Sequence, residues 1–326
     1  MTPHGGSRTL RLLPRLAIAA GLTGYMLWKS HPSEVLAAAA GADWRPMALA
    51  VVLVLIDRTL MAYRWVALLC IVDPRQRPPL GALIQVFFVS TFLGTFLPAS
   101  IGSDVLRSYG AAQLNVGTAD AVASVVVDRV FGVASILTMA VVGLLLIGSP
   151  GGGAAVALAL GAAAAVCLVA GLLIFSRSSV TFFAGVLARL PSGTLNRIGA
   201  RGLGSIQKYA SHPGQLLNVF LCSIAVQGIR TVQAYYLGLG LGLRVSLTTY
   251  VALIPLILLI MLLPVTFNGV GTSQAAFVWS FGSVGVEAPA AFALSILFVA
   301  LGIVGNLPGG LLYIRGMGLR PQRRNL

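Results

Sequence analysis

The chain has 326 residues, of which 57% are hydrophobic and only 9% carry a charged side chain. With a mean hydropathy of +0.93, this composition excludes an ordinary water-soluble globular protein, whose surface needs about 25–35% charged residues. The net charge of +14 does not indicate a nucleic-acid interface, because most basic residues fall in short segments between apolar runs. That distribution is typical of a membrane protein whose basic loops set its orientation.

Six apolar runs are long enough to cross a membrane. A helix needs about 20 apolar residues to span a hydrocarbon core of about 30 Å, and no run of alternating polarity indicates a barrel of strands. The first run follows three arginines, as in a signal peptide, but without a small-residue cleavage site and a soluble domain after it, so we interpret it as an uncleaved span. The sequence therefore predicts an all-α, polytopic membrane helical bundle with six full spans, at residues 12–28, 46–70, 119–147, 154–175, 213–240 and 288–314.

Two further apolar segments, residues 81–110 and 246–285, are interrupted near the middle by a Leu-Pro pair followed by glycine. Proline removes a backbone donor and clashes with the preceding turn, and glycine permits a sharp reversal. We therefore expect each segment to form two half-helices of a re-entrant hairpin. The residues predicted to break the helices are Pro98, Gly102, Pro264, Gly269 and Gly271.

The distribution of basic residues supports two re-entrant hairpins. In that arrangement fifteen lysines and arginines lie on one side of the membrane, and only Lys29, Arg45 and Arg244 lie on the other. The positive-inside rule places the fifteen, and both termini, in the cytoplasm. Two spans, a hairpin and a third span then occur twice in opposite orientation, in residues 1–150 and 151–326. We predict a single membrane domain built from an inverted repeat, with its binding site at the midplane between the broken segments.

Charged side chains within the spans are the candidate functional residues, because each costs about 2.5–3.5 kcal/mol on insertion scales and tends to face a bundle interior or a wet cavity. Asp57 and Arg58 are adjacent, as are Asp128 and Arg129. Adjacent residues point about 100° apart on a helix. Each is therefore expected to pair with a group on another span.

Several of these groups have a second interpretation. Arg64 beside Trp65 could be an interfacial pair whose cation reaches the membrane surface. Arg107, which can pair with an acid three residues earlier on the same helical face, could serve only to orient the chain. Asp128 and Arg129 could form a structural cross-link between helices.

The functional interpretation joins the charged groups around a polar cavity that accepts an anionic head group. The planar fork of arginine holds phosphate with two parallel hydrogen bonds, and helix N-termini at the breaks add positive potential. A break in mid-membrane itself implies such a cavity, because free backbone groups are tolerated only against protein or water. The predicted substrate-binding residues are Arg64, Asp104, Arg107, Asp128, Arg129, Arg230, Asn268 and Gln274.

Motifs of soluble enzymes are not found in the sequence. His4, His31 and His212 are too scattered for a metal site or a catalytic triad, and the three cysteines lack the spacing of a zinc or redox pair. The glycine-rich turn at 151–153 lacks the Lys-Ser or Lys-Thr of a phosphate loop. We therefore predict no enzymatic activity, no cofactor and no metal.

Four segments resemble motifs of the lysylphosphatidylglycerol synthase transmembrane-region family, a group of flippase-like bacterial and archaeal membrane proteins. They are Arg64-Trp65, LPASIGSDVLR (97–107), ASVVVDRVFG (123–132) and LPVTFNGVG (263–271). The resemblance covers most of the chain and implies the translocation module without the soluble aminoacyltransferase domain of the synthase members. The lipid substrates that it implies are phospholipids, polyprenyl-linked sugars and hopanoid-type lipids.

The chain departs from the family pattern at several of these positions. Ser103 and Asn268 stand where the family has glycine, and Asp128 stands where it has glutamate. Residues 272–274, Thr-Ser-Gln, replace a common Arg-Glu pair. The last change removes a charge pair, so an ion-coupled mechanism is not carried over from the family.

The function expected from the sequence is a lipid translocase of the bacterial inner membrane, with a membrane lipid as substrate. The alternative is a non-enzymatic accessory subunit that binds lipid or partners a membrane glycosyltransferase. A third hypothesis is an intramembrane transferase with Asp104 or Asp128 as base. Neither the lipid substrate nor the oligomeric state follows from these sequence patterns.

Overall fold

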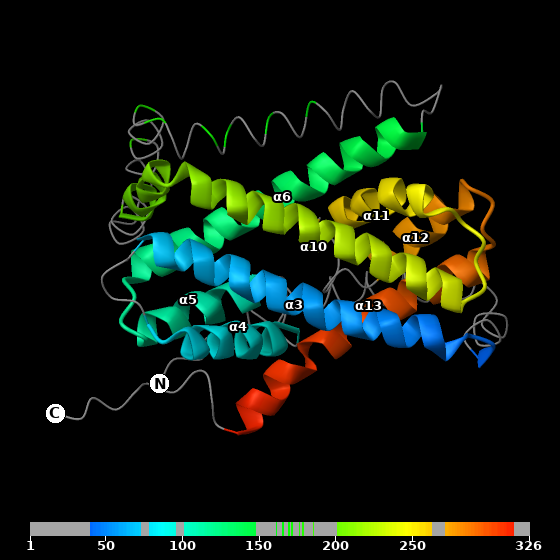
Figure 1. Ribbon diagram of the computed structural model, residues 1–326, viewed down its shortest axis with the longest axis horizontal. Coiled ribbons are helices and arrows are strands. Elements are labelled where there is room, and N and C mark those ends of the chain that lie inside the picture. The colour runs from blue at the N-terminus through cyan, green and yellow to red at the C-terminus, as the bar shows by residue number, and fades with distance from the viewer. Residues whose placement is uncertain are drawn as a thin grey trace, which may run out of the picture.

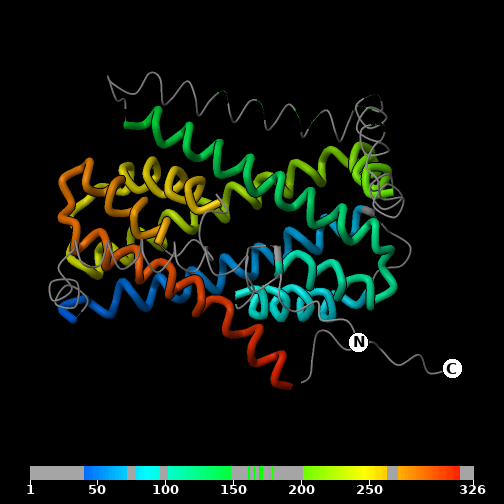
Figure 2. Tube along the Cα trace, turned by 180° about the vertical axis from the view of Figure 1, so that it is seen from behind, coloured from blue at the N-terminus to red at the C-terminus, as the bar shows by residue number. Residues whose placement is uncertain are grey.

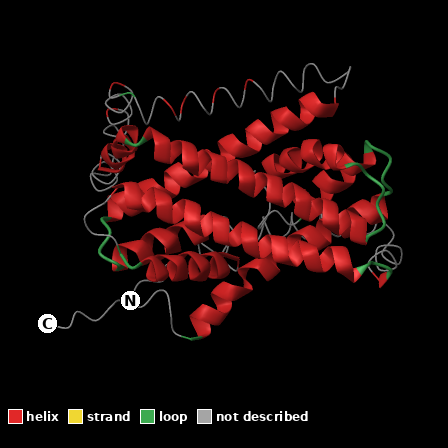
Figure 3. Ribbon diagram, viewed as in Figure 1, coloured by secondary structure: helices red, strands yellow, loops and turns green. Residues whose placement is uncertain are grey.

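The computed structural model describes residues 40–72, 78–95, 101–147, 201–262 and 271–315, with isolated positions between 161 and 185. Within these ranges every regular element is a helix (Figure 3). Four helices have the length and apolar composition needed to cross a membrane. They are α3 (Trp44–Val72), α6 (Thr118–Ile147), α10 (Pro213–Gly240) and α13 (Ala288–Ile314).

These four helices confirm the helices predicted at 46–70, 119–147, 213–240 and 288–314. The predicted spans 12–28 and 154–175 lie outside the continuous described ranges. Each of the two broken segments contains two helices that contact one another. The first holds α4 (Leu80–Thr95) and α5 (Ile101–Gln113), and the second holds α11 (Leu247–Leu262) and α12 (Thr272–Gly282).

Two of the five predicted helix breakers lie among the described residues. Pro98, Pro264 and Gly269 lie outside the described residues. Gly271 caps α12 with a φ of +88°, a left-handed conformation that favours glycine. Gly102 was expected to break the helix, but it lies inside α5, which has already begun at Ile101.

Helices α3 and α10 lie side by side through the centre of the molecule (Figure 1). We call this pair of helices the central axis. They run in opposite directions, because the backbone N–H of Asp43, just before α3, donates to the carbonyl of Gly240 at the end of α10 at 2.8 Å. In Figure 1, α4 and α5 lie at one end of this axis and α11 and α12 at the other. Each broken segment therefore covers a different end of the same pair of helices.

The long helix that follows each broken segment packs on a helix of the other broken segment. Helix α6 contacts α11, and α13 contacts α4 (Figure 2). Both crossings depend on glycine: a Cβ at Gly143 would overlap the backbone of Ala252, and a Cβ at Gly309 would overlap the carbonyl of Phe88. The close backbone approach at these two positions leaves no room for a side chain.

The helix contacts keep the same pattern when the helices from α3 to α6 are exchanged with those from α10 to α13. If α3, α4, α5 and α6 are replaced by α10, α11, α12 and α13, each of the more extensive helix pairs maps onto another such pair. For example, the contact of α5 with α6 maps onto that of α12 with α13, and α3 with α10 maps onto itself.

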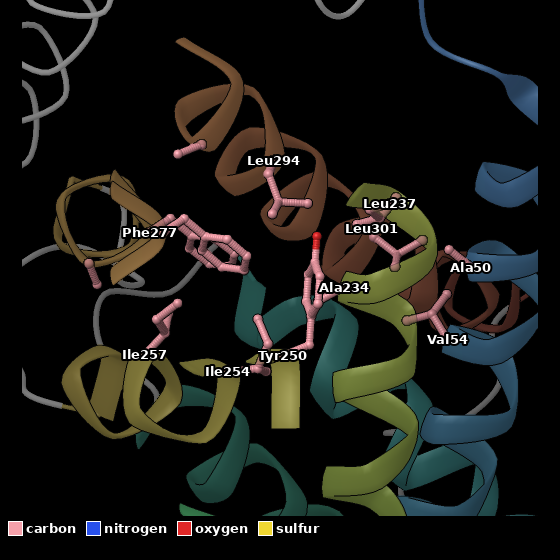
Figure 4. Close-up of a cluster of buried hydrophobic side chains, with 13 residues drawn as sticks. Ala50, Val54, Ala234, Leu237, Tyr250, Ile254, Ile257, Phe277, Leu294 and Leu301 are labelled. Atoms are coloured by element: carbon pink, nitrogen blue, oxygen red, sulfur yellow. The ribbon is translucent and has the colours of Figure 1, made fainter. Parts of the chain in front are cut away.

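Two apolar cores surround the ends of the central axis. At the α11–α12 end, Tyr250 and Phe277 pack with Ile254, Ile257 and Leu294 (Figure 4). The other core, around Trp65, joins α3 to α4, α5 and α6, whose buried side chains include Leu83, Phe87, Ala111 and Val125. On α3 the charged pair Asp57-Arg58 lies between these cores, which places a polar layer at the middle of the helix.

A third cluster of buried residues joins α3, α6 and α10 beside a short 3-10 helix, η1 (Lys208–Ser211). Tyr209 of η1 is fully buried there, and burial raises the pKa of its hydroxyl. Its side chain therefore stays neutral where it packs against the ends of the long helices.

Candidate functional site

The first charged group at the site is centred on Asp57, near the middle of α3. Its carboxylate accepts hydrogen bonds from Nη1 of Arg58 and from Nε of Arg230 on α10, each at 3.2 Å. Asp57 is buried. The expected pairing with another helix is present. Asp57 also pairs with its neighbour, because the long arginine side chain folds back.

Arg58 and Arg230 share a further acceptor, the sulfur of Met61. Nη2 of Arg230 lies 3.0 Å from that sulfur and Nη1 of Arg58 lies 3.4 Å from it. Arg58 also donates to the carbonyl of Gly302 on α13 at 3.3 Å. One carboxylate therefore holds two guanidinium groups, and these link α3 to α10 and α13.

The second charged group is buried between α3, α5, α6 and α10. Asp128 accepts from Nε of Arg64 at 2.7 Å and from Nη1 of Arg107 at 3.3 Å. Arg64 also donates to Ser223 on α10 at 3.0 Å. The structural interpretation of Asp128 therefore describes its position well, since it cross-links two other helices.

Two aromatic rings pack against Arg107 in this buried group. The guanidinium carbon of Arg107 lies 4.7 Å from the ring centroid of Phe87 and 5.5 Å from that of Trp65. Because Arg64 is only 4% exposed and Trp65 is fully buried, their interpretation as an interfacial snorkelling pair was wrong. Both side chains point into the bundle, where Asp128 supplies the counter-charge that a membrane surface would otherwise provide.

The third charged group joins α5 to α6. Asp104 accepts two hydrogen bonds from Arg129, at Nε and Nη2, each at 2.8 Å. The pairing of Asp104 with Arg107 on the same helix is present at 3.8 Å but is longer. Arg129 has a side chain that is 44% exposed. Unlike Asp128 beside it, Arg129 is accessible to a ligand.

A cavity of about 550 Å³ lies beside the middle of α3 and α10, with α4, α11 and α13 also in its wall. Among the described residues, its charged lining consists of three arginines, Arg58, Arg129 and Arg230, and one aspartate, Asp57. Arg107 and Asp104 are not among the lining residues, although Asp104 binds Arg129, which is one of them. The cavity therefore has an excess of positive charge.

Uncharged residues complete the lining of the cavity. Asn306 on α13 donates to the Thr95 hydroxyl on α4 at 2.9 Å, and Gln233 and Ser103 contribute further polar side chains. Sequence reasoning missed these residues because it searched the spans for charges only. An amide in an apolar run, such as Asn306, gives the same kind of signal and could have been found in the same way.

Of the two residues predicted in the second broken segment, Gln274 lies in the described part of the chain, and it is not part of the cavity lining. Asn268 lies outside the described residues. Gln274 is buried, and its side-chain oxygen accepts from the backbone N–H of Gly271 and from the Ser273 hydroxyl. Gln274 therefore holds the first turn of α12. Within the described ranges, no three His, Cys, Asp or Glu side chains are grouped so as to hold a metal ion.

Comparison with known protein families matches residues 12–309 to the family described as lysylphosphatidylglycerol synthase TM region. Comparison with curated proteins and with solved structures finds no match. The family match covers nearly the whole chain and includes the segments that hold all three charged groups. The chain therefore belongs to the lysylphosphatidylglycerol synthase TM region family and is a multi-pass membrane protein.

Proposed function

We propose that this protein is a lipid translocase that moves an amphiphile with an anionic head group between the leaflets of a bacterial inner membrane. The observation that carries the proposal is the central cavity, in which three arginines face a single aspartate. Arginine is suited to phosphate because its planar fork donates two parallel hydrogen bonds. A surplus of arginine inside a membrane bundle is costly, and an anionic ligand offsets that cost.

The uncharged part of the cavity suits the rest of an amphiphile. Leu258, Phe298, Val299 and Ile303 line it from α11 and α13. Polar and apolar walls therefore lie within one space, as a molecule with a charged head and hydrocarbon tails requires. The head group would move through the cavity while its tails remain in lipid.

The exchange pattern of the helix contacts supports an inverted repeat as the basis of movement. The two broken segments lie at opposite ends of the α3–α10 axis, and both halves contribute to the cavity wall. In transporters with inverted repeats, rocking of one half against the other exposes a midplane site to each side in turn. We propose the same movement here, with two re-entrant hairpins and cytoplasmic termini.

An intramembrane transferase receives no support from the geometry. A general base must be able to take a proton, yet Asp128 is held by two arginines and Asp104 by the fork of Arg129. We therefore propose that the protein acts without chemical conversion of its lipid.

The test is lipid scrambling by the purified protein in liposomes. Fluorescent phosphatidylglycerol is incorporated in both leaflets, and a membrane-impermeant reductant measures how fast the inner label becomes accessible. Arg230→Gln removes one charged donor, so the rate is expected to fall by about tenfold or more. Arg45→Gln, at the exposed start of α3, is the control and leaves the rate unchanged.

A second variant separates transport from folding. Because Arg230→Gln also leaves Asp57 with one partner fewer, the conservative variant Arg230→Lys, which keeps the positive charge beside Asp57 but lacks the planar fork, is measured alongside, together with its thermal unfolding. A folded Arg230→Lys variant with a reduced rate supports the proposal. Absence of scrambling for every lipid tested, by wild-type protein that unfolds cooperatively, contradicts it and favours the accessory subunit.

A further inference from the structure

A second hollow lies on the outer side of α5 and α6, with a volume of about 710 Å³. Its walls are mostly apolar, and they include five valines, Val105, Val122, Val125, Val126 and Val130. Val105 is 60% exposed and Val126 is 44% exposed. We call this hollow the α5–α6 groove.

The groove and the central cavity share one residue, Arg129. Asp104 lies at the groove side of that arginine and holds its fork with two hydrogen bonds at 2.8 Å. The Asp104–Arg129 ion pair therefore separates the two spaces. A ligand whose anionic group displaced Asp104 from the fork would have access to both.

The length of the groove suits a hydrocarbon chain. Asp104 and Gln113 are separated along α5 by about 13.5 Å at a rise of about 1.5 Å per residue. That is close to half of a hydrocarbon core of about 30 Å, the depth of one leaflet. The groove is therefore long enough to hold most of one acyl chain.

We propose that the α5–α6 groove holds an acyl chain of a membrane lipid while the phosphate of that lipid replaces Asp104 on Arg129, so that the ion pair is the gate between groove and cavity. The occupant is a lipid because the groove is mostly apolar and has the guanidinium of Arg129 at one end. Its anionic group would accept the same two hydrogen bonds that Asp104 now accepts, so the fork of Arg129 stays paired during the exchange. This inference rests on the proposed function.

The experiment uses phosphatidylglycerol with a photoreactive group in its acyl chain, in liposomes containing the full-length protein. After illumination, mass spectrometry of peptides locates the label. We expect labelling on α5 and α6 residues of the groove. Val126→Trp should reduce that labelling by about tenfold, because displacing two methylene groups from an apolar site already costs that factor.

A matched control lies on the same helix. Val142 is 40% exposed but is not part of the groove, so Val142→Trp should leave the labelling unchanged. Val105→Trp, on the α5 wall of the groove, should reduce the labelling as Val126→Trp does. The same loss in both variants could not be explained by misfolding of one of them. Equal labelling of wild type and both groove variants, or labelling spread evenly over all exposed helices, overturns the inference.

The outcome also separates this inference from the proposed function. Scrambling by wild-type protein without groove labelling leaves the translocase intact and removes the groove from its path. Groove labelling that tryptophan blocks, in a protein that scrambles no lipid, supports the lipid site and contradicts translocation.

Discussion

At the scale of single residues, the groups around Asp57 and Asp128 each hold two arginines on one aspartate. They differ in what compensates the surplus positive charge. In the group around Asp128, the ring faces of Trp65 and Phe87 lie against Arg107, which stabilises the cation by its attraction to the aromatic quadrupole. The group around Asp57 opens instead onto the central cavity. The first arrangement is suited to structure and the second to a ligand.

Asp128→Asn is expected to destabilise the protein strongly. It leaves Arg64 and Arg107 buried without their carboxylate, and breaking a buried pair typically costs about 3–5 kcal/mol. Thermal unfolding in detergent measures the loss. The control is Asp120→Asn on the same helix, whose partner Lys208 is about half exposed, and an exposed pair contributes about 0–1 kcal/mol. Equal shifts for both variants would contradict the cross-linking role.

The charged residues could be recognised from the sequence because a charge within an apolar run is conspicuous. The sequence did not show which of these residues join helices and which line the cavity. Asp128 and Arg129 are adjacent, yet one is buried and the other is accessible, since the rotation of α6 against α3 and α5 decides which residue faces inward. That rotation depends on packing between helices far apart in the sequence.

At the scale of elements, the long apolar runs predicted helices well, whereas the Leu-Pro pattern was less specific. Leu307-Pro308 is followed by Gly309 and Gly310, much like the two broken segments, yet α13 continues through it. Pro255 likewise lies inside α11. Gly309 and Gly310 are explained by the close approach of Phe88 and Phe92 on α4, a contact that no local sequence rule reveals.

Gly143→Ala and Gly309→Ala are each expected to lower stability by about 1–3 kcal/mol, because the added methyl group must push neighbouring backbone aside. Thermal unfolding of the purified variants tests this. Gly228→Ala on α10 is the control: its Cβ would meet no atom within 4 Å, so the higher helix propensity of alanine should leave stability equal or raise it by up to about 1 kcal/mol. Unaltered stability of both crossing variants would show that α6 and α13 can shift at little cost.

At the scale of the whole molecule, two re-entrant hairpins require that the chain enter and leave each broken segment on the same side of the membrane. Single cysteines test this in a variant from which Cys70, Cys167 and Cys222 have been removed. Cysteine at Pro79 or Thr118 should react with an impermeant maleimide only after the cells are opened. Cysteine at Arg244 or Ser283 should react in intact cells. All four positions are exposed in the structure, and opposite behaviour of Pro79 and Thr118 would show a full crossing.

The packing of α6 on α11 and of α4 on α13 has a consequence for how the protein is made. Helices α4 and α6 leave the ribosome well before the partners that cover their crossing faces. Until then, those faces must lie against lipid or an insertion factor. The crossing of α4 is completed only when α13 is made, so a ribosome that stops before α13 leaves a product that lacks this contact.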